Sequence, residues 1–397
     1  MSIGIRALRS TGATTIALAT VCTLTVGAAG RATADTGPTT AHMAVDLPLP
    51  PGAIRSYATG VNDSGVIVGY AADAANRYYP VRWNADLSPT PLPLLSRFQL
   101  GDARAISEDG TIVGSSGSHQ VRWAPDGTIT VMRPLPGDAY GYVYTIGRTG
   151  TAIGYSALGA ATRAVKWGPD GAPVALPALS GDVNTRALWV NSSGTVAGLS
   201  YSAAGVARPV KWTPDGTPVA LDPASAYRNV WVDGINDAGT VLGQGAPTGG
   251  PNNQKHSLTW KADGTVTDLG PRSRAMAINA SGTTVGYGSG ANNIDYTAMS
   301  WSPDGTARAI GAGYAYTRAV DVNDSGVSVG HIGQKVPGDT RRHALRWESD
   351  GTMTDLDVAP QDHAYAEHIN NAGLIVGARV TYPTPTSSER FAVVWRP

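Results

Sequence analysis

The segment AVDVNDSGVSVG at residues 319–330, followed by HALRW at 343–347 and DGTMTDL at 350–356, decides the fold because the chain contains eight copies of it. Pairs of glycines four residues apart recur at steps of 40 to 47 residues, at Gly65/Gly69, Gly110/Gly114, Gly150/Gly154, Gly194/Gly198, Gly239/Gly243, Gly282/Gly286, Gly326/Gly330 and Gly373/Gly377. One tryptophan follows each pair, at Trp83, Trp123, Trp167, Trp212, Trp260, Trp301, Trp347 and Trp395. A fixed period of this length indicates a propeller or a solenoid.

Each copy contains four short strand patterns separated by turn signals. In six copies an asparagine, preceded by Val or Ile, stands three residues before the first glycine, which is typical of a strand that ends in a tight turn. The residues after that glycine begin a second strand, the tryptophan ends a third, and an apolar residue nine positions later lies on a fourth. Four antiparallel strands in about 44 residues predict one propeller blade. The sequence therefore predicts an all-β, eight-bladed β-propeller.

The two ends of the repeat region complement each other. The last copy stops at Pro397 without a fourth strand, whereas residues 43–47 resemble the fourth strand at residues 353–356. We expect the N-terminal strand to complete the last blade and close the ring, because closure removes an unpaired strand edge. An open solenoid is the competing architecture, but it needs polar caps at both ends, and neither terminus offers one.

The first 34 residues have the layout of a secretory signal peptide. Arg6 and Arg9 precede an uncharged run over residues 10–30, and residues 32–34 form a small-x-small cleavage signal. We expect residues 1–34 to be removed, residues 35–42 to form a linker and residues 43–397 to form the propeller. An uncleaved anchor is the alternative, although threonine and glycine dilute the run. The mature chain is expected to be secreted and to contain no membrane span.

Composition excludes several classes of function. Basic and acidic side chains balance at 30 each, so the chain has no electrostatic footprint for nucleic acid. The single cysteine, Cys22, lies in the expected signal peptide, which excludes disulfides, thiolate metal sites and cysteine nucleophiles from the mature protein. No phosphate loop, calcium loop or G-x-S-x-G motif occurs. We therefore expect no cofactor, no metal and a monomer.

The repeat also resembles a known family. The pattern Ala-x-x-[Val/Ile]-Asn-x-x-Gly-x-x-x-Gly, followed by HALRW at 343–347, Asp350-Gly351 and Leu356, is similar to the HAF repeats of extracellular bacterial proteins. The resemblance covers residues 43–397, although the naming histidine recurs only as His119, His256 and His343. It implies a secreted repeat protein and carries no catalytic motif.

One repeat position is the best candidate for a binding surface. The residues five positions before the turn asparagine, or before the residue that replaces it, are Tyr57, Asp102, Tyr142, Arg186, Trp231, Arg274, Arg318 and Tyr365. Because innermost strands start near the rim of the channel, we expect a ring of stacking faces and charged groups. Aromatic faces suit sugars, and arginine suits anionic groups. The alternative is that these side chains pack between blades or cover solvated loops.

A polar pair also stands out. Asp321 and His368 occupy the same repeat position in consecutive copies, so neighbouring blades should bring them within hydrogen-bonding reach. An ordinary pair that satisfies two polar groups is the favoured interpretation, and an acid/base pair is the hypothesis beside it.

Two classes of function remain open. The first is a secreted binding or scaffold propeller that recognises an extracellular carbohydrate, cell-wall component or protein. The second is a hydrolase or lyase that acts on polysaccharide with carboxylates above the channel. Converging carboxylates with displaced pKa values favour the enzyme, and converging aromatic and arginine side chains favour binding, which we prefer. The long loops at residues 247–255 and 335–342 are either functional or tolerated insertions.

Overall fold

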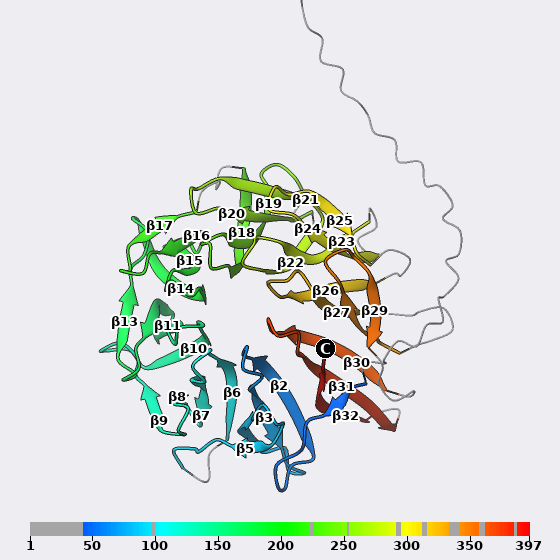
Figure 1. Cartoon of the computed structure of the whole chain (residues 1–397). Coiled ribbons are helices and arrows are strands. Elements are labelled where there is room, and N and C mark those ends of the chain that lie inside the picture. The colour runs from blue at the N-terminus through cyan, green and yellow to red at the C-terminus, as the bar shows by residue number, and fades with distance from the viewer. Residues whose placement is uncertain are drawn as a thin grey trace, which may run out of the picture. The chain divides into compact units, whose positions relative to one another are not determined.

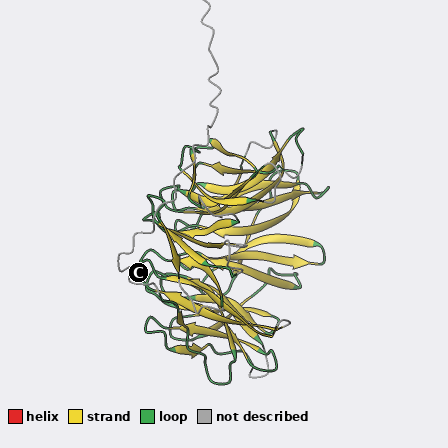
Figure 2. Cartoon of the chain, turned by 90° about the vertical axis from the view of Figure 1, so that its right-hand side faces the viewer, coloured by secondary structure: helices red, strands yellow, loops and turns green. Residues whose placement is uncertain are grey.

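The computed structural model describes residues 43–96, 100–221, 226–251, 254–290, 295–311, 316–332, 341–356, 362–384 and 387–397. These residues form strands and loops without a helix (Figure 2), and eight four-stranded antiparallel sheets surround a central axis (Figure 1). The predicted signal peptide and linker, and residues 252–253 and 335–340 of the two long loops, lie outside the described residues. The prediction of an all-β, eight-bladed propeller is confirmed.

The first four blades each use four consecutive strands, innermost strand first. Blade 1 comprises β2 (Arg55–Val61), β3 (Ile67–Ala72), β4 (Tyr78–Trp83) and β5 (Pro89–Pro91). Blade 2 comprises β6 (Gly101–Ile106), β7 (Ile112–Ser116), β8 (His119–Trp123) and β9 (Ile129–Met132). Blade 3 comprises β10 (Tyr140–Ile146), β11 (Ala152–Leu158), β12 (Ala161–Trp167) and β13 (Pro173–Leu176). Blade 4 comprises β14 (Asp182–Val190), β15 (Val196–Ser202), β16 (Ala207–Trp212) and β17 (Pro218–Ala220).

The remaining four blades repeat this arrangement. Blade 5 comprises β18 (Tyr227–Ile235), β19 (Val241–Pro247), β20 (His256–Trp260) and β21 (Val266–Pro271). Blade 6 comprises β22 (Ser273–Ile278), β23 (Thr284–Ser289), β24 (Tyr296–Trp301) and β25 (Ala307–Ala309). Blade 7 comprises β26 (Thr317–Val322), β27 (Ser328–Ile332), β28 (Ala344–Trp347) and β29 (Met353–Leu356). Blade 8 comprises β30 (His363–Ile369), β31 (Ile375–Thr384), β32 (Ser387–Trp395) and β1 (Val45–Asp46).

The N-terminal strand closes the ring, as the repeat predicts. β1 pairs with β32 in antiparallel fashion, and Val45 lies opposite Val394. Leu47, directly after β1, is only 2% exposed. The Arg379 guanidinium in β31 donates hydrogen bonds of 3.0 and 2.6 Å to the two carboxylate oxygens of Asp46. Backbone pairing, apolar burial and an ion pair therefore all hold the closing strand in the last blade.

The repeated tryptophans form the centre of each blade core. All eight are fully buried, and each is the last residue of the third strand of its blade. In five blades the indole N–H donates a hydrogen bond of 2.7 to 3.0 Å to a carbonyl in the segment before the innermost strand of that blade. The indole nitrogens of Trp260 and Trp347 have no acceptor among the described residues, so in the five bonded blades the tryptophan fixes the link between blades in addition to packing in the core.

The two glycines of each pair are required for different reasons. The first glycine of every pair has a φ between 77° and 88°, the left-handed region that a turn after the asparagine requires. At the second glycine an added Cβ would lie 1.8 to 2.2 Å from a carbonyl oxygen of the adjacent innermost strand. Each innermost strand also shifts register nearby, as from Ala58 to Gly60, so only glycine allows this close approach.

The turn asparagines link the blades to one another. Asn62 Oδ1 accepts the N–H of Val66 at 3.0 Å, which caps the turn as predicted. Asn62 Nδ2 donates to the backbone carbonyl of Ser107 in the next blade at 3.2 Å. The same blade-to-blade bond recurs at Asn191, Asn236, Asn279 and Asn323. Asn370 donates to the carbonyl of Asn62 at 2.8 Å, across 308 residues of sequence, and so completes the circle.

Candidate functional site

The two ends of the ring differ in chemistry. We call the end where the innermost strands begin the start face, and the end where they finish in their asparagine turns the turn face. Because the strands of a blade alternate in direction, the links between blades also reach the start face. Aromatic and arginine side chains gather at the start face, many of the arginines with a paired carboxylate, and five carboxylate residues line a cavity at the turn face.

The eight residues of the predicted ring lie one per blade on the innermost strands. They are Tyr57 (β2), Asp102 (β6), Tyr142 (β10), Arg186 (β14), Trp231 (β18), Arg274 (β22), Arg318 (β26) and Tyr365 (β30). Seven are half-buried, and Trp231 is 41% exposed. Their placement on the innermost strands agrees with the repeat, and their role in binding remains a prediction.

Many of these side chains contact the neighbouring blade. Arginine guanidinium groups lie 4.5 to 5.6 Å from the ring centroids of tyrosines across the seam, in the pairs Arg104/Tyr142, Arg186/Tyr155, Arg318/Tyr296, Arg342/Tyr365 and Arg390/Tyr57. Arg274 instead forms an ion pair of 3.3 Å with Asp233 of blade 5. Packing between blades, the alternative interpretation, therefore describes part of what these residues do. Cation–π contacts of this kind fix the tyrosine faces in place.

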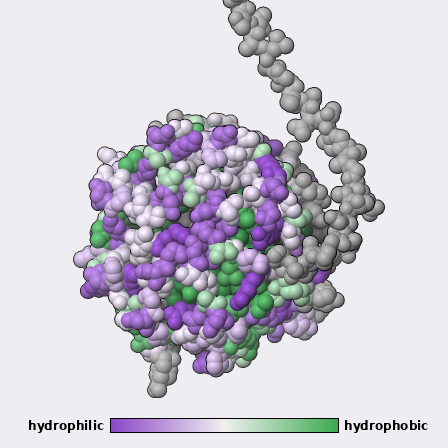
Figure 3. Space-filling view, in the orientation of Figure 1, coloured by the Kyte–Doolittle hydropathy of each residue, from purple (hydrophilic) through white to green (hydrophobic). Residues whose placement is uncertain are grey.

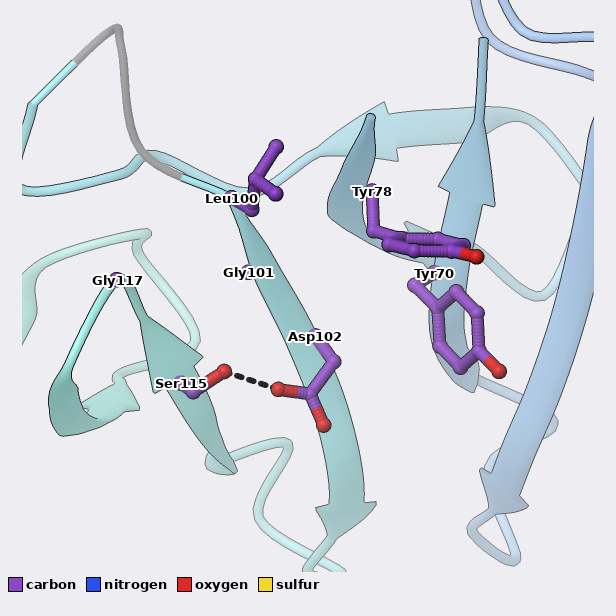
Figure 4. Close-up of a pocket in the computed structure, with 7 residues that line it drawn as sticks. All are labelled: Tyr70, Tyr78, Leu100, Gly101, Asp102, Ser115 and Gly117. Carbon is purple, nitrogen blue, oxygen red and sulfur yellow. Dashed lines mark hydrogen bonds between the residues drawn. The ribbon is translucent and has the colours of Figure 1, made fainter. Parts of the chain in front are cut away.

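A cavity of about 570 Å³ lies at the start face between blades 1 and 2 (Figure 4). Its lining residues are Tyr70, Tyr78, Leu100, Gly101, Asp102, Ser115 and Gly117. The rings of Tyr70 and Tyr78 meet edge-on with centroids 5.5 Å apart, and Tyr57 stacks on Tyr70 at 4.6 Å. Tyr70 and Tyr78 of blade 1 thus form the aromatic wall of the cavity, and Tyr57 supports it by stacking on Tyr70.

The opposite wall of this cavity is polar and rigid. The Ser115 hydroxyl donates a hydrogen bond to the Asp102 carboxylate (Figure 4), and Arg104 Nε donates to it at 2.8 Å. Arg104 is itself held by Gln120 Oε1 at 2.7 Å. A Cβ at Gly101 would lie 2.5 Å from the Ser115 carbonyl oxygen, so glycine is required where the wall begins. The Asp102 carboxylate is therefore a fixed hydrogen-bond acceptor across the cavity from the rings of Tyr70 and Tyr78.

Burial changes the acidity of the aromatic wall. Burial raises the pKa of the Tyr70 phenol, and it also raises the pKa of Tyr144 and of Tyr155 in blade 3. These phenols therefore keep their protons at neutral pH. They can donate hydrogen bonds to an uncharged ligand while their rings provide apolar contact area.

A second cavity, of about 230 Å³, lies at the turn face and is lined by residues of seven blades. Five of its lining residues carry carboxylates, at Asp63, Glu108, Asp237, Asp321 and Asp324. A view along the ring axis shows hydrophilic residues gathered at the centre of the ring (Figure 3). This is the convergence of carboxylates that an enzyme with acidic groups at the channel requires.

Hydrogen bonds between blades occupy these carboxylates. Four of them accept a backbone N–H from the preceding blade at 2.8 to 2.9 Å, at Asp63, Glu108, Asp237 and Asp324. Burial acts to raise the pKa of Asp63, but hydrogen bonds from the Asn371 backbone and from Arg148 outweigh it, and the pKa is lowered. The ionised Asp63 carboxylate therefore joins blade 1 to blade 8 by accepting the Asn371 N–H.

Asp321 and His368 approach each other without a direct hydrogen bond. Asp321 Oδ2 lies 3.9 Å from His368 Nδ1, an ion-pair distance longer than a hydrogen bond. The same oxygen accepts the Ile369 N–H at 3.0 Å. Burial raises the pKa of Asp321, and the nearby His368 opposes that rise. The expected direct hydrogen bond is therefore replaced by a bond to the neighbouring backbone.

Some residues of the candidate site were not predicted. Tyr70, Ser115 and Tyr155 each follow the second glycine of a repeat pair, and the register places each opposite a member of the predicted ring. Aligning the copies at that position would have found them. Tyr78 is the first residue of the third strand, five positions before the repeat tryptophan, and Tyr296 occupies the same position in blade 6.

Comparison with known proteins is limited to the fold. No protein-family model and no curated protein matches the chain. A solved virginiamycin B lyase from Staphylococcus aureus is 13% identical, with 89% of this chain and 99% of that chain covered and a TM-score of 0.43. The β-propeller domain of the Trilobed protease from Pyrococcus furiosus is 11% identical over 78% and 97% of the chains, with a TM-score of 0.48. A prolyl endopeptidase structure is 8% identical over 80% and 53%, with a TM-score of 0.52.

The eight four-stranded sheets themselves place the chain among β-propellers, and these likenesses identify no activity. Within the described residues no group of three or more His, Cys, Asp or Glu side chains is arranged to hold a metal ion. A search of the same residues found no helix long and apolar enough to cross a membrane.

Proposed function

We propose that this chain is a secreted β-propeller that binds an extracellular carbohydrate-containing ligand through its start face. The observation that carries the proposal is the cavity between blades 1 and 2, where a wall of tyrosines faces a fixed acceptor. Sugar rings have apolar C–H faces that stack on aromatic side chains, and hydroxyl groups that need acceptors such as the Asp102 carboxylate. The site offers both kinds of contact.

Rigidity of the site favours binding. The acceptor and its arginine are connected through Gln120 to the next blade, since Gln120 Oε1 also accepts the Val143 N–H at 3.1 Å. Arg104 donates to the Val143 carbonyl at 3.0 Å as well. A site held in place before the ligand arrives loses less entropy on binding.

A glycan array probed with residues 35–397 tests this proposal. We expect binding to a subset of oligosaccharides, and we expect Tyr78→Ala to weaken it at least about tenfold, which is the loss of one stacked ring. The matched control is Tyr140→Ala, because Tyr140 has similar exposure on blade 3 but does not line the cavity. Absence of any saccharide binding, or equal loss in both variants, would contradict the proposal.

The carboxylates of the turn-face cavity support a second candidate function, a hydrolase or lyase that acts on polysaccharide. We rank it below binding because all five groups accept a backbone N–H from a neighbouring blade, Asp321 from Ile369 of blade 8. Asp321 is the exception with a raised pKa, so it is the residue to test. Release of new chain ends from polysaccharides, abolished in Asp321→Asn and retained in Tyr78→Ala, would establish the enzyme instead.

A further inference from the structure

Three nitrogen-bearing side chains meet at the start face between blades 7 and 8. Arg318 on β26 lies opposite His331 on β27, and Arg342 stands just before β28. β26 and β27 lie beside β30 of blade 8 (Figure 1), which carries Tyr365. The His331 ring meets Tyr365 edge-on at 5.2 Å, and the Arg342 guanidinium lies over the same ring at 5.4 Å. We call Arg318, His331, Arg342 and Tyr365 the blade 7–8 cluster.

The two arginines of this cluster have no carboxylate partner. Neither Arg318 nor Arg342 forms an ion pair with any residue in the part of the chain that the structure describes. Six other arginines at the start face do form one, in the pairs Arg104–Asp102, Arg163–Asp138, Arg208–Asp182, Arg274–Asp233, Arg379–Asp46 and Arg390–Glu367. Among the described residues, the positive charge at this seam therefore has no carboxylate partner, whereas the six arginines named above are neutralised locally.

Two buried nitrogen atoms of the cluster also lack hydrogen-bond partners. They are Nε of Arg318 and Nδ1 of His331, while the Arg318 terminal nitrogen donates to the Tyr296 hydroxyl at 2.7 Å. Burial, together with the charges of Arg318 and Arg342, lowers the pKa of His331 to about 3. His331 is therefore neutral at physiological pH. Seven other buried side-chain nitrogens of the described residues also lack a partner, so these two atoms support a ligand site only together with the two arginines beside them.

We infer that the blade 7–8 cluster binds the oxyanion of an acidic saccharide, either the carboxylate of a hexuronate or a sulfate ester. An oxyanion accepts several N–H bonds at once and matches the planar guanidinium group. It would compensate both arginines and give the buried nitrogens an acceptor. Tyr365 contacts both His331 and Arg342, so its ring lies beside the groups that would bind the anion. The inference rests on the proposed function, because it assumes a saccharide ligand, and it adds that this saccharide carries a negatively charged group.

Isothermal titration calorimetry at low ionic strength tests the inference with residues 35–397. The probes are a neutral oligosaccharide, a uronic-acid oligosaccharide and a sulfated oligosaccharide of equal length, and inorganic sulfate alone. We expect at least one acidic form to bind about tenfold more tightly than the neutral form, and to weaken as salt is added. The stronger of the two acidic ligands distinguishes a carboxylate site from a sulfate site.

Three variants assign this preference to residues. Arg342→Gln and Arg318→Gln should each reduce the affinity for the acidic ligand to near that for the neutral one. Arg208→Gln is the matched control, because Arg208 lies near the start of a third strand but is already paired with Asp182 at 2.9 Å. Arg342 is exposed, so its variant should retain the wild-type thermal midpoint and keep the test valid if Arg318→Gln misfolds.

The outcomes separate this inference from the proposed function. Equal affinity for acidic and neutral saccharides, or a preference that persists in both cluster variants, overturns the inference and leaves carbohydrate binding intact. If no saccharide binds, the proposed function is wrong, and the titration with inorganic sulfate then tests whether the blade 7–8 cluster binds an anion. Sulfate binding that is lost in Arg342→Gln and kept in Arg208→Gln supports the anion site, and no sulfate binding overturns it.

Discussion

The asparagine that ends an innermost strand performs two structural tasks with one amide group. Its oxygen caps its own turn, and its nitrogen donates to the next blade. Spacing within the repeat predicts the first task, because both partners lie within four residues. The second task was not predicted, because its acceptor lies 43 or more residues away and comes near only in the assembled ring.

Replacing Asn370 by alanine should lower the free energy of unfolding by about 1–3 kcal/mol, since it leaves the Leu374 N–H without its acceptor and removes one of the two donors to the Asn62 carbonyl, the other being the Gly65 N–H. Urea denaturation measures the change. Asn84→Ala is the control, because the Asn84 side chain bonds only to Ser88 and Thr90 near its own turn. A loss as large in the control would show that the bond between blades contributes nothing special.

The lowered pKa of Asp63 predicts how the stability of the protein depends on pH. Its pKa is lowered in the folded state, so its contribution to stability is present above the unfolded pKa of about 3.9 and is lost as the pH falls through the folded value. The stability advantage of the wild type over Asp63→Asn should therefore shrink from pH 6 to pH 2. Denaturation curves at several pH values measure it. A stability advantage that stays constant over this pH range would show that the ionised form of the Asp63 carboxylate does not stabilise the contact between blades.

At the scale of the strand, β1 is short but carries much of the closure. It contributes two ladder residues, and its main apolar contact is the adjacent Leu47, which packs in the core shared by blades 8 and 1. Arg379 ties it to the body of the blade through Asp46 and also binds Asp362 at 2.8 Å. The strand therefore depends on side chains more than on backbone pairing.

Leu47→Ala should lower the free energy of unfolding by about 2–5 kcal/mol, because it creates a cavity at a fully packed position. Val45→Ala is the matched control on the same segment. Val45 is 45% exposed, so its truncation should change stability by less than about 0.5 kcal/mol. Thermal unfolding followed by circular dichroism compares the two. Equal midpoints would mean that the N-terminal segment does not hold the last blade.

At the scale of the whole molecule, repetition explains why the fold was predictable and the site was not. The glycines, tryptophans and asparagines recur because every blade solves the same packing problem, and eight copies make their spacing plain. The cavity between blades 1 and 2 arises where blades differ. Tyr78 and Gly101 each recur in one other blade, as Tyr296 and Gly141, so neither position follows a pattern shared by all eight copies.

The predicted ring shows the same limit. Its members could be placed on the innermost strands from the repeat alone, but their contacts depend on the neighbouring blade. Arg274 and Arg318 occupy the same repeat position, yet Arg274 pairs with Asp233 and Arg318 has no carboxylate partner among the described residues. Only the packed structure distinguishes a neutralised arginine from a free one.

Every seam and both faces depend on a closed ring, so the closure itself is the claim to measure. Residues 35–397 contain no cysteine, and Asp46 lies directly opposite Val393 in the register of β1 and β32. After mild oxidation of the double variant Asp46→Cys/Val393→Cys, peptide mass spectrometry should find one disulfide within the same chain, since antiparallel partners lie within bridging distance. The control Asp46→Cys/Thr130→Cys, with its second cysteine in blade 2, should form none. Free thiols in the folded double variant, or bridges only between chains, would contradict the closed propeller.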